Sequence, residues 1–322
     1  MRWTYREAAT MKPDISVQVP VKNGGDAFSR FLGSLALQDI QAGWEVVIVD
    51  DGSEKPVLQE FRREIDSLPD NCTVKVVRLD PGGNRPVARN EASRVSTAPV
   101  SLLMDGDMEF GPSLLRRHLE IKEETGADVV MGRRVNSFSS NASPWQKWFD
   151  TRAMGVSPSG AFPWKYFITG NLSITRGLLE KAGGFDPAIN CYGGEDTEMG
   201  YRLNAMGVSF RWDPELAVNH LDDVSVEEHS LKMLEYGRTG LRYTLGKHPG
   251  TRGLLGSKWV EPVFSSPAYL CPVRLSVRFF LLRPLYRAVL RFASKHGGPP
   301  VLFTYLSVGA CLTGLRGRDF RN

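Results

Sequence analysis

The sequence is poor in cysteine, and its cysteines stand far apart. Its 322 residues include four, namely Cys72, Cys191, Cys271 and Cys311, and no two of them form a Cys-x-x-Cys pair. This pattern excludes a disulfide-rich scaffold and gives no sign of a cysteine zinc site. A reducing compartment is therefore the simpler expectation.

Long apolar runs are also missing. Residues 1–14 lack the apolar core of a signal peptide, and the apolar run at residues 301–312 has twelve residues, where a membrane-spanning helix needs about twenty. We expect this run to be buried or to dip into a membrane interface. Hydrophobic residues at 42% and charged residues at 24% are the shares of a folded protein. These observations predict a folded, cytoplasmic chain of enzyme size.

Acidic residues are nearly absent from the C-terminal region. Residues 270–322 carry nine basic residues against one acid, Asp319, a formal charge of +8. The other 269 residues hold 31 basic and 35 acidic residues, a formal charge of −4. The net charge of +4 thus conceals two regions that we expect to meet different partners.

Apolar strand-like segments alternate with helix-compatible segments in the first third of the chain. The strands are expected at residues 14–20, 44–50, 73–79 and 99–104, with helices from about Phe28 to Leu35 and near 55–67 and 86–97. This alternation predicts an α/β fold, a mostly parallel sheet with helices on both faces. In such sheets ligands bind at the carboxyl ends of the strands, so the polar loops there are the candidate site.

One of these loops, Asp105-Gly106-Asp107, places two carboxylates around a glycine directly after a strand. Carboxylates of this kind can bind a hard divalent cation that also takes diphosphate oxygens. His220 could complete such a cation shell as a neutral imidazole. The alternatives are a simple Asp-Gly turn and a core or surface histidine.

Two further segments contain candidates for nucleotide binding. In Asp50-Asp51-Gly52-Ser53, a carboxylate could accept hydrogen bonds from a nucleobase, or the segment could be a turn or helix cap. Arg85 and Arg89 could place a guanidinium against a phosphate or an aspartate, or lie on a solvated helix face.

Glycine-glycine-acid-acid at residues 193–196 opens a predicted helix. Carboxylates at a helix N-terminus are stabilised by the helix dipole, so Glu195 and Asp196 could be capping residues. Two adjacent acids after a flexible Gly-Gly also suit a general base that must meet an acceptor hydroxyl.

Taken together, the motifs resemble those of inverting family-2 glycosyltransferases of the GT-A fold. The segments that carry this resemblance are VQVPVKNGG, EVVIVDDGS, GGNRPVARNEA, SLLMDGDMEF, FITGNLSITRGLLEKAGGFDP and GGEDTEMGYRL, in this order from residue 14 to about 222. The Gly-Gly-Glu-Asp segment followed by His220 is also similar to the C-terminal part of chondroitin-polymerase-like and galactosyltransferase-like enzymes.

The resemblance implies a role for each matching residue. Asp196 would be the general base, and Glu195 would orient hydroxyl groups. Asp105, Asp107 and His220 would hold the metal, a manganese or magnesium ion. The nucleotide and donor would meet residues from several loops: Pro20, Val21, Asn23, Asp51, Arg85, Arg89, Asp105, Gly106, Gly170 and Asn171.

The activity implied is metal-dependent transfer of a sugar from a nucleoside diphosphate donor to a hydroxyl acceptor, with inversion. A UDP-sugar is the donor that the resemblance favours, and a lipid-linked or membrane-proximal glycan is the expected acceptor, as in polysaccharide or cell-envelope assembly. The loop after the first strand reads Pro-Val-Lys-Asn where the family more often has Thr or Ser and Tyr. A Gln-x-x-Arg-Trp motif is missing, because Val208 stands in the place of its glutamine before Arg211 and Trp212, so a non-processive enzyme is expected.

The C-terminal region is expected to associate with an anionic membrane surface through residues 273–315. Basic residues recur in steps of four or five from Arg274 to Lys295, which favours a basic amphipathic helix that Pro284 bends or divides. A solvated helix packed on the enzyme body is the alternative. We expect a catalytic domain at 12–225, with a nucleotide-binding half at 12–125 and an acceptor-binding half at 126–225, and a helical extension at 226–322 on the inner face of the membrane.

Three other functions fit less well. A sugar nucleotidyltransferase would need a Gly-rich, Arg-containing loop after its first strand, which is missing. A catalytically inactive carbohydrate- or membrane-binding module would be expected to have lost some of its acids, but Asp51, Asp105, Asp107 and Asp196 are all present. Nucleic-acid binding is not expected, because the basic residues stand among long aliphatic side chains.

Overall fold

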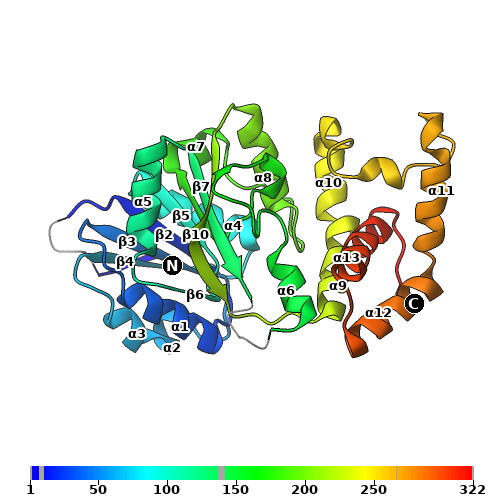
Figure 1. The fold of residues 1–322 in the computed structure, drawn as a ribbon. Coiled ribbons are helices and arrows are strands. Elements are labelled where there is room, and N and C mark those ends of the chain that lie inside the picture. The colour runs from blue at the N-terminus through cyan, green and yellow to red at the C-terminus, as the bar shows by residue number, and fades with distance from the viewer. Residues whose placement is uncertain (1, 7–10, 137–141, 266, 321–322) are drawn as a thin grey trace. The chain divides into compact units, whose positions relative to one another are not determined.

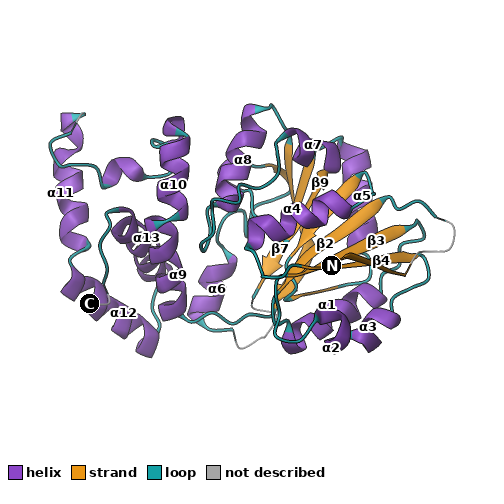
Figure 2. Cartoon of the chain, turned by 180° about the vertical axis from the view of Figure 1, so that it is seen from behind, coloured by secondary structure: helices purple, strands orange, loops and turns teal. Residues whose placement is uncertain are grey.

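The computed structural model describes residues 2–6, 11–136, 142–265 and 267–320. Contacts divide the chain into two compact units. The first unit comprises residues 1–138, 150–190 and 196–222, and the second comprises residues 139–149, 191–195 and 223–322. Figures 1 and 2 show the sheet of the first unit and the helices of the second. The domain limits drawn from the sequence stay a prediction.

The first unit is built on one sheet, in which the described strands follow the order β1-β4-β3-β2-β5-β9-β7-β10-β6, with β8 paired to β10. The strands span β1 Arg2–Arg6, β2 Ile15–Val21, β3 Trp44–Asp50, β4 Cys72–Arg78, β5 Val100–Met104, β6 Met108–Phe110, β7 Val129–Val135, β8 Gly160–Ala161, β9 Asn171–Thr175 and β10 Phe210–His220. Strands β4, β3, β2 and β5 are mutually parallel. The four expected strands are therefore confirmed.

Helices cover both faces of this sheet, as expected. The helices of the first unit are α1 Gly25–Ala36, α2 Val57–Glu60, α3 Arg62–Asp66, α4 Arg85–Val95, α5 Leu114–Thr125, α7 Arg176–Lys181 and most of α8 Glu195–Ala205. Val46 and Ile48 of β3 join the core cluster beneath α1, whereas Val47 and Val49 join α4 on the opposite face. Side chains alternate along a strand, so this run of valine and isoleucine is buried on both faces.

The second half of the sheet differs from a purely parallel arrangement. Strand β9 runs antiparallel between β5 and β7, and β6 pairs antiparallel with β10. These reversals bring the start of β9 beside the end of β5, and the start of β6 beside the end of β10. Residues far apart in the sequence therefore meet at one edge.

The second unit is helical. Its helices are α9 Val226–Arg238, α10 Gly240–Lys247, α11 Cys271–Phe280, α12 Arg283–His296, α13 Pro300–Leu315 and most of α6 Pro144–Asp150. Its 3-10 turns lie at Pro249–Thr251, Ser257–Trp259 and Ala268–Leu270. The first unit has a 3-10 turn at Trp164–Tyr166. A capping box between Ser225 and Glu228 starts α9. Helices α9 and α13 approach closely at glycines, since a Cβ on Gly314 would lie 2.0 Å from the carbonyl oxygen of Leu234.

The C-terminal helices agree with the sequence in part. The expected basic helix is divided, with α11 ending at Phe280 and α12 beginning at Arg283, just before Pro284. The run 301–312 lies within α13, where Phe303, Leu306 and Ala310 join the core of the unit. The exposed basic face of the expected amphipathic helix does not include Arg274, which is fully buried. None of the described helices has the length and apolar character needed to cross a bilayer.

Candidate active site

The carboxyl end of β3 separates two adjacent carboxylates into different environments. The Asp50 carboxylate is hydrogen-bonded to nearby protein groups: it accepts hydrogen bonds from the backbone N–H groups of Ser53 and Val57 and from the Arg78 guanidinium. Asp51 instead accepts a 2.6 Å hydrogen bond from the N–H of Gly83. The glycine loop 82–83 can approach this closely because a Cβ on Gly82 would lie 2.3 Å from the Asp51 carbonyl oxygen. Asp51 thus faces the loop that precedes α4, and its contact with a nucleobase stays a prediction.

Asp105 follows β5 and lies among guanidinium groups. Its Oδ1 accepts a 2.9 Å hydrogen bond from Arg89, and its Oδ2 lies 3.8 Å from Arg134. Burial raises the pKa of this carboxyl, but Arg89, Arg134 and Arg85 lower it by more, so its pKa lies below the ordinary value. An ionised Asp105 among three arginines suits a site that also receives phosphate oxygens.

Strand β9 determines the surroundings of both Asp105 and Asp196. Gly170, at φ +108°, lies against Asp105, where an added Cβ would be 2.7 Å from Oδ2. The preceding residue, Thr169, donates from its backbone N–H (3.0 Å) and its hydroxyl (2.9 Å) to the two carboxylate oxygens of Asp196 on α8. Arg89 lies between the two acids, because its second guanidinium nitrogen is 3.8 Å from Asp196. Asp105 and Asp196 therefore belong to one site.

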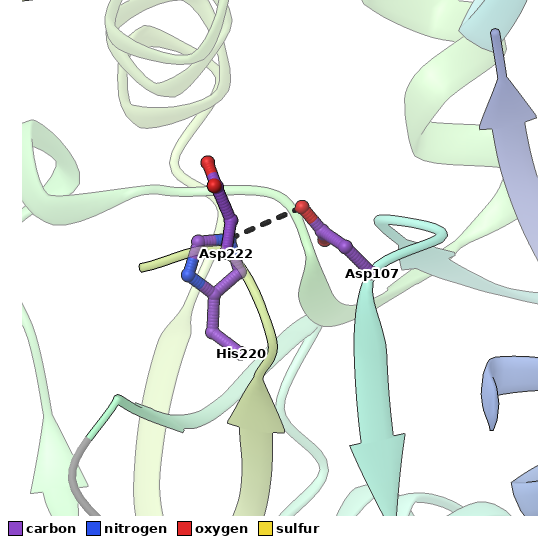
Figure 3. A group of neighbouring side chains, drawn as sticks. All are labelled: Asp107, His220 and Asp222. Carbon is purple, nitrogen blue, oxygen red and sulfur yellow. Dashed lines mark ion pairs between the residues drawn. The ribbon is translucent and has the colours of Figure 1, made fainter. Parts of the chain in front are cut away.

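A second group of ligand-type side chains lies where β6 and β10 pair. The register sets His220 opposite Met108, and the N–H of Leu221 donates to the carbonyl oxygen of Asp107. His220 Nε2 is consequently 3.3 Å from Asp107 Oδ2. Figure 3 shows Asp222 close to the His220 imidazole and Asp107. One ligand atom from each of the three residues lies within 4.8 Å of the other two.

This group fits a divalent cation. Two carboxylates and an imidazole are a donor set that manganese and magnesium accept. Within the described chain, Asp107 Oδ1 is a buried oxygen with no hydrogen-bond partner. A buried carboxylate oxygen in that state is costly unless something else satisfies it. The other ring nitrogen of His220, Nδ1, is 2.9 Å from the side-chain amide of Asn136, which orients the ring.

The structure places the other predicted residues as follows. Asn171 is buried, and its side chain is hydrogen-bonded to His118 and to the carbonyl oxygen of Leu216. Asn23 holds the loop after β3 through Ser53 and the N–H of Glu54. Glu195 is buried, and the division of the chain by contacts assigns it to the second unit.

Four more predicted residues lie around the same loops. Pro20 and Val21 end β2, and Arg85 opens α4. Gly106 packs closely on Phe28, since an added Cβ would lie 3.1 Å from its ring. The donor roles of all these residues stay predictions.

Four contributors to the site went unnoticed in the sequence: Arg134, Asn136, Thr169 and Asp222. Asp222 stands two residues after His220, a spacing that could have suggested it. Arg134 and Asn136 flank the end of β7, and only the pairing of β7 with β10 brings them to the site. Thr169 gains its role from the antiparallel direction of β9.

The sheet order and the helices on both faces of the sheet define an α/β fold of the GT-A type. The family model described as "Glycosyl transferase family 2" matches residues 16–185, more than half of the chain. The chain belongs to this family and is a glycosyltransferase. A second model, "N-terminal domain of galactosyltransferase", matches residues 155–222. The resemblance inferred from the motifs is thereby confirmed.

Curated relatives carry the same activity class in their names. Validoxylamine A glucosyltransferase of Streptomyces hygroscopicus subsp. jinggangensis is 29% identical over 230 residues, which are 62% of this chain and 54% of the relative. Hyaluronan synthase of Pasteurella multocida is 25% identical, over 61% of this chain and 23% of the relative. The chain thus spans about half the length, or less, of these relatives.

Solved structures share the fold. Mannosyltransferase PcManGT from Pyrobaculum calidifontis, in complex with GDP-Man and Mn²⁺, is 17% identical with a TM-score of 0.62, covering 96% of this chain and 89% of that one. S. aureus TarS 1-349 in complex with UDP is 18% identical with a TM-score of 0.54, covering 94% and 89%.

Proposed function

We propose that this glycosyltransferase moves a sugar from a nucleoside diphosphate donor to a hydroxyl group of an acceptor, with inversion and with a divalent cation. The observation that carries the proposal is the position of Arg89, which hydrogen-bonds Asp105 and also lies 3.8 Å from Asp196. The candidate diphosphate end and the candidate base are thereby held at a fixed separation by one buried side chain.

On the donor side, Asp51 would read the nucleobase, while Arg85 and Arg134 would face the diphosphate. Asp107 and His220 would hold a manganese or magnesium ion, with Asp222 beside them. Such an ion, when bound, neutralises negative charge on the leaving diphosphate. PcManGT with its Mn²⁺ and GDP-Man supports this choice of cofactor and donor class.

On the acceptor side, Asp196 would be the base. The acceptor oxygen attacks the anomeric carbon, the bond from that carbon to the diphosphate oxygen breaks, and Asp196 takes the hydroxyl proton. Attack from the face opposite the leaving group inverts the configuration. Thr169 donates hydrogen bonds to both carboxylate oxygens of Asp196. The base is therefore oriented before the acceptor arrives, which favours proton transfer from a correctly placed hydroxyl group.

UDP is the nucleotide we propose for the donor, and the transfer is non-processive. TarS has been solved in complex with UDP and in complex with UDP-GlcNAc, which supports a uridine carrier. The acceptor would be a glycan that is lipid-linked or close to a membrane, as in polysaccharide or cell-envelope assembly, and the enzyme would work at the inner membrane face. The charge of the C-terminal region supports this placement, because acids are nearly absent from residues 270–322.

Asp196→Asn tests the base. This change should lower kcat by roughly 100- to 10,000-fold, because a carboxamide cannot take the acceptor proton. Donor binding, measured by calorimetry with UDP and manganese, should stay close to wild type. Turnover within a few-fold of wild type would contradict the role of Asp196 and make Glu195 the next candidate.

Thr169 provides a matched pair of control variants. Thr169→Ser keeps the hydroxyl donor to Asp196 and should retain most activity. Thr169→Val removes this donor and should lower kcat with little change in KM, because the base loses its fixed orientation. Equal activity of the two variants would show that this hydroxyl does not position the base.

A further inference from the structure

Helix α11 faces the protein with its basic side. Arg274 is 0% exposed, donating to the carbonyl oxygen of Lys258 at 2.9 Å and to Oε2 of Glu261 at 2.9 Å. One turn later, Arg278 donates to the carbonyl oxygen of Glu261 at 3.1 Å. These hydrogen bonds fix how α11 is rotated about its own axis.

The opposite side of α11 is apolar and lies in solvent. At 3.6 residues per turn, the apolar residues of this side lie roughly 100° to 140° around the helix axis from Arg274, in both directions. Leu275 is 63% exposed, Phe279 59% and Phe280 54%. Val273 and Leu282, at the ends of the same segment, are also exposed. Ser276 is the exposed polar residue on this side, and its hydroxyl donates to the carbonyl oxygen of Pro272. Ordinary surface helices bury their apolar side, so a side with this many exposed apolar residues marks a binding surface.

Helix α12 has the usual orientation and supplies positive charge. Tyr286 and Ala293 are buried in the core of the second unit. The basic residues of α12 lie on the other side, and all are exposed or half-buried: Arg283, Arg287, Arg291 and Lys295. The sequence between Glu261 and Asp319 has no acidic residue. A helix with an exposed apolar side is therefore followed in the chain by a helix whose exposed side carries basic residues and no acidic ones.

We infer that the exposed face of α11 inserts into the headgroup region of an anionic membrane, while the basic face of α12 contacts the lipid phosphates. A bilayer surface offers both an apolar layer and negative charge at the depth that such a segment needs. A second copy of this chain fits less well, since a symmetric contact would oppose the same basic residues. The inference deepens the proposed membrane-proximal function without depending on sugar transfer.

Vesicle co-sedimentation of the full chain tests the inference, with vesicles of phosphatidylcholine alone or mixed with phosphatidylglycerol. Wild type should bind the anionic vesicles at low salt. The double variant L275S/F279S should weaken this binding by about tenfold or more, since each apolar side chain loses its burial in the interface. The triple variant R283Q/R287Q/R291Q should lose the preference for anionic over neutral vesicles.

A control variant separates this surface from general hydrophobicity. L37S/V156S changes two exposed apolar residues of the first unit, 70% and 71% exposed, and should bind vesicles like wild type. Calorimetry with UDP and manganese should give the same affinity for all these variants, so a failure of donor binding would count against the proposed function alone. Vesicle binding unchanged in L275S/F279S would overturn the inference. A dimer in solution that L275S/F279S dissociates, without vesicle binding by wild type, would also overturn it.

Discussion

Charges of opposite sign alternate across the candidate site, residue by residue. Asp105 lies between Arg89 and Arg134, and Arg89 in turn lies between Asp105 and Asp196. Asp105 is thereby kept ionised, and Asp196 is oriented by Thr169, before any ligand binds. A site preorganised in this way spends little energy on rearrangement during the reaction.

Gly170 is the residue whose backbone allows the closest approach to this site. Gly170→Ala should destabilise the fold by about 1–3 kcal/mol because φ is +108°. It should also weaken nucleotide binding by about tenfold or more, because the new Cβ displaces Asp105. Thermal unfolding and calorimetry check both effects. Gly33→Ala is the matched control, since its added Cβ meets nothing within 4 Å in α1, and it should be neutral or stabilising.

His118 makes the stability of the first unit depend on pH. Burial lowers its pKa from 6.5 to about 4, with both ring nitrogens hydrogen-bonded to Ser173 and Asn171. Between these two pKa values His118 binds a proton in the unfolded chain but stays neutral in the folded chain, so the free energy of unfolding falls as the pH drops below 6.5. We expect about 2 kcal/mol of loss from this group between pH 7 and 5.

Urea unfolding at the two pH values measures this loss. His118→Gln should unfold more easily than wild type at pH 7, and its stability should change less between pH 7 and 5. A variant with the same pH dependence as wild type would show that His118 titrates normally in the folded chain.

At the scale of elements, one buried carboxylate joins the ends of several segments. Glu45 of β3 is fully buried and accepts from Lys75 of β4 at 2.5 Å, and from Ser96, Thr97 and Ala98 after α4. Burial raises the pKa of Glu45, but Lys75 and the backbone donors lower it by a larger amount, so the pKa lies below its ordinary value. The contribution of ionised Glu45 to the free energy of unfolding is present at neutral pH and is lost as the pH falls through this pKa.

Glu45→Gln should destabilise the folded chain by about 3 kcal/mol at pH 7, because Lys75 and the backbone donors lose a charged partner. The difference from wild type should shrink in acid. Glu180→Gln, which removes an exposed pair with Arg176, should unfold close to wild type. Equal urea midpoints for the Glu45 and Glu180 variants would contradict this account.

The sequence predicted those elements whose pattern is local. Strand β3 contains an unbroken apolar run from Val46 to Val49, and the segment near 86–97 is compatible with a helix, so β3 and α4 could be located. The direction of β9 could not, because β-pairing depends on partners distant in the sequence. The rotation of α11 was also missed: the arginine spacing suggested a basic outer face, but hydrogen bonds to Glu261 and nearby carbonyls turn Arg274 inward.

The same contrast holds for the site. The carboxylates after β3 and β5 were found because strand ends in parallel sheets are where ligands bind. Arg134 is brought to the site by the pairing of β7 with β10, and the contact of Thr169 with Asp196 depends on the antiparallel direction of β9, although Thr169 itself lies in a matched segment.

At the scale of the whole molecule, the two units divide the work that we propose. The first unit holds the described residues of the nucleotide and metal site, and the second holds the apolar face of α11 and the basic face of α12. Chemistry and localisation can then be altered separately. Variants on the exposed faces of α11 and α12 should leave nucleotide binding unchanged, and variants at Asp105 or Asp107 should leave vesicle binding unchanged.

Metal-dependent nucleotide binding is the central claim, and calorimetry tests it most directly. Wild type and Asp107→Ala would each be titrated with UDP, GDP, CDP and dTDP, with manganese and with a chelator. We predict that one nucleotide, UDP, binds wild type only with manganese, and that Asp107→Ala weakens this binding by about tenfold or more. No binding of any nucleotide to wild type, or UDP binding that the chelator and the Asp107 variant leave unchanged, would contradict the claim.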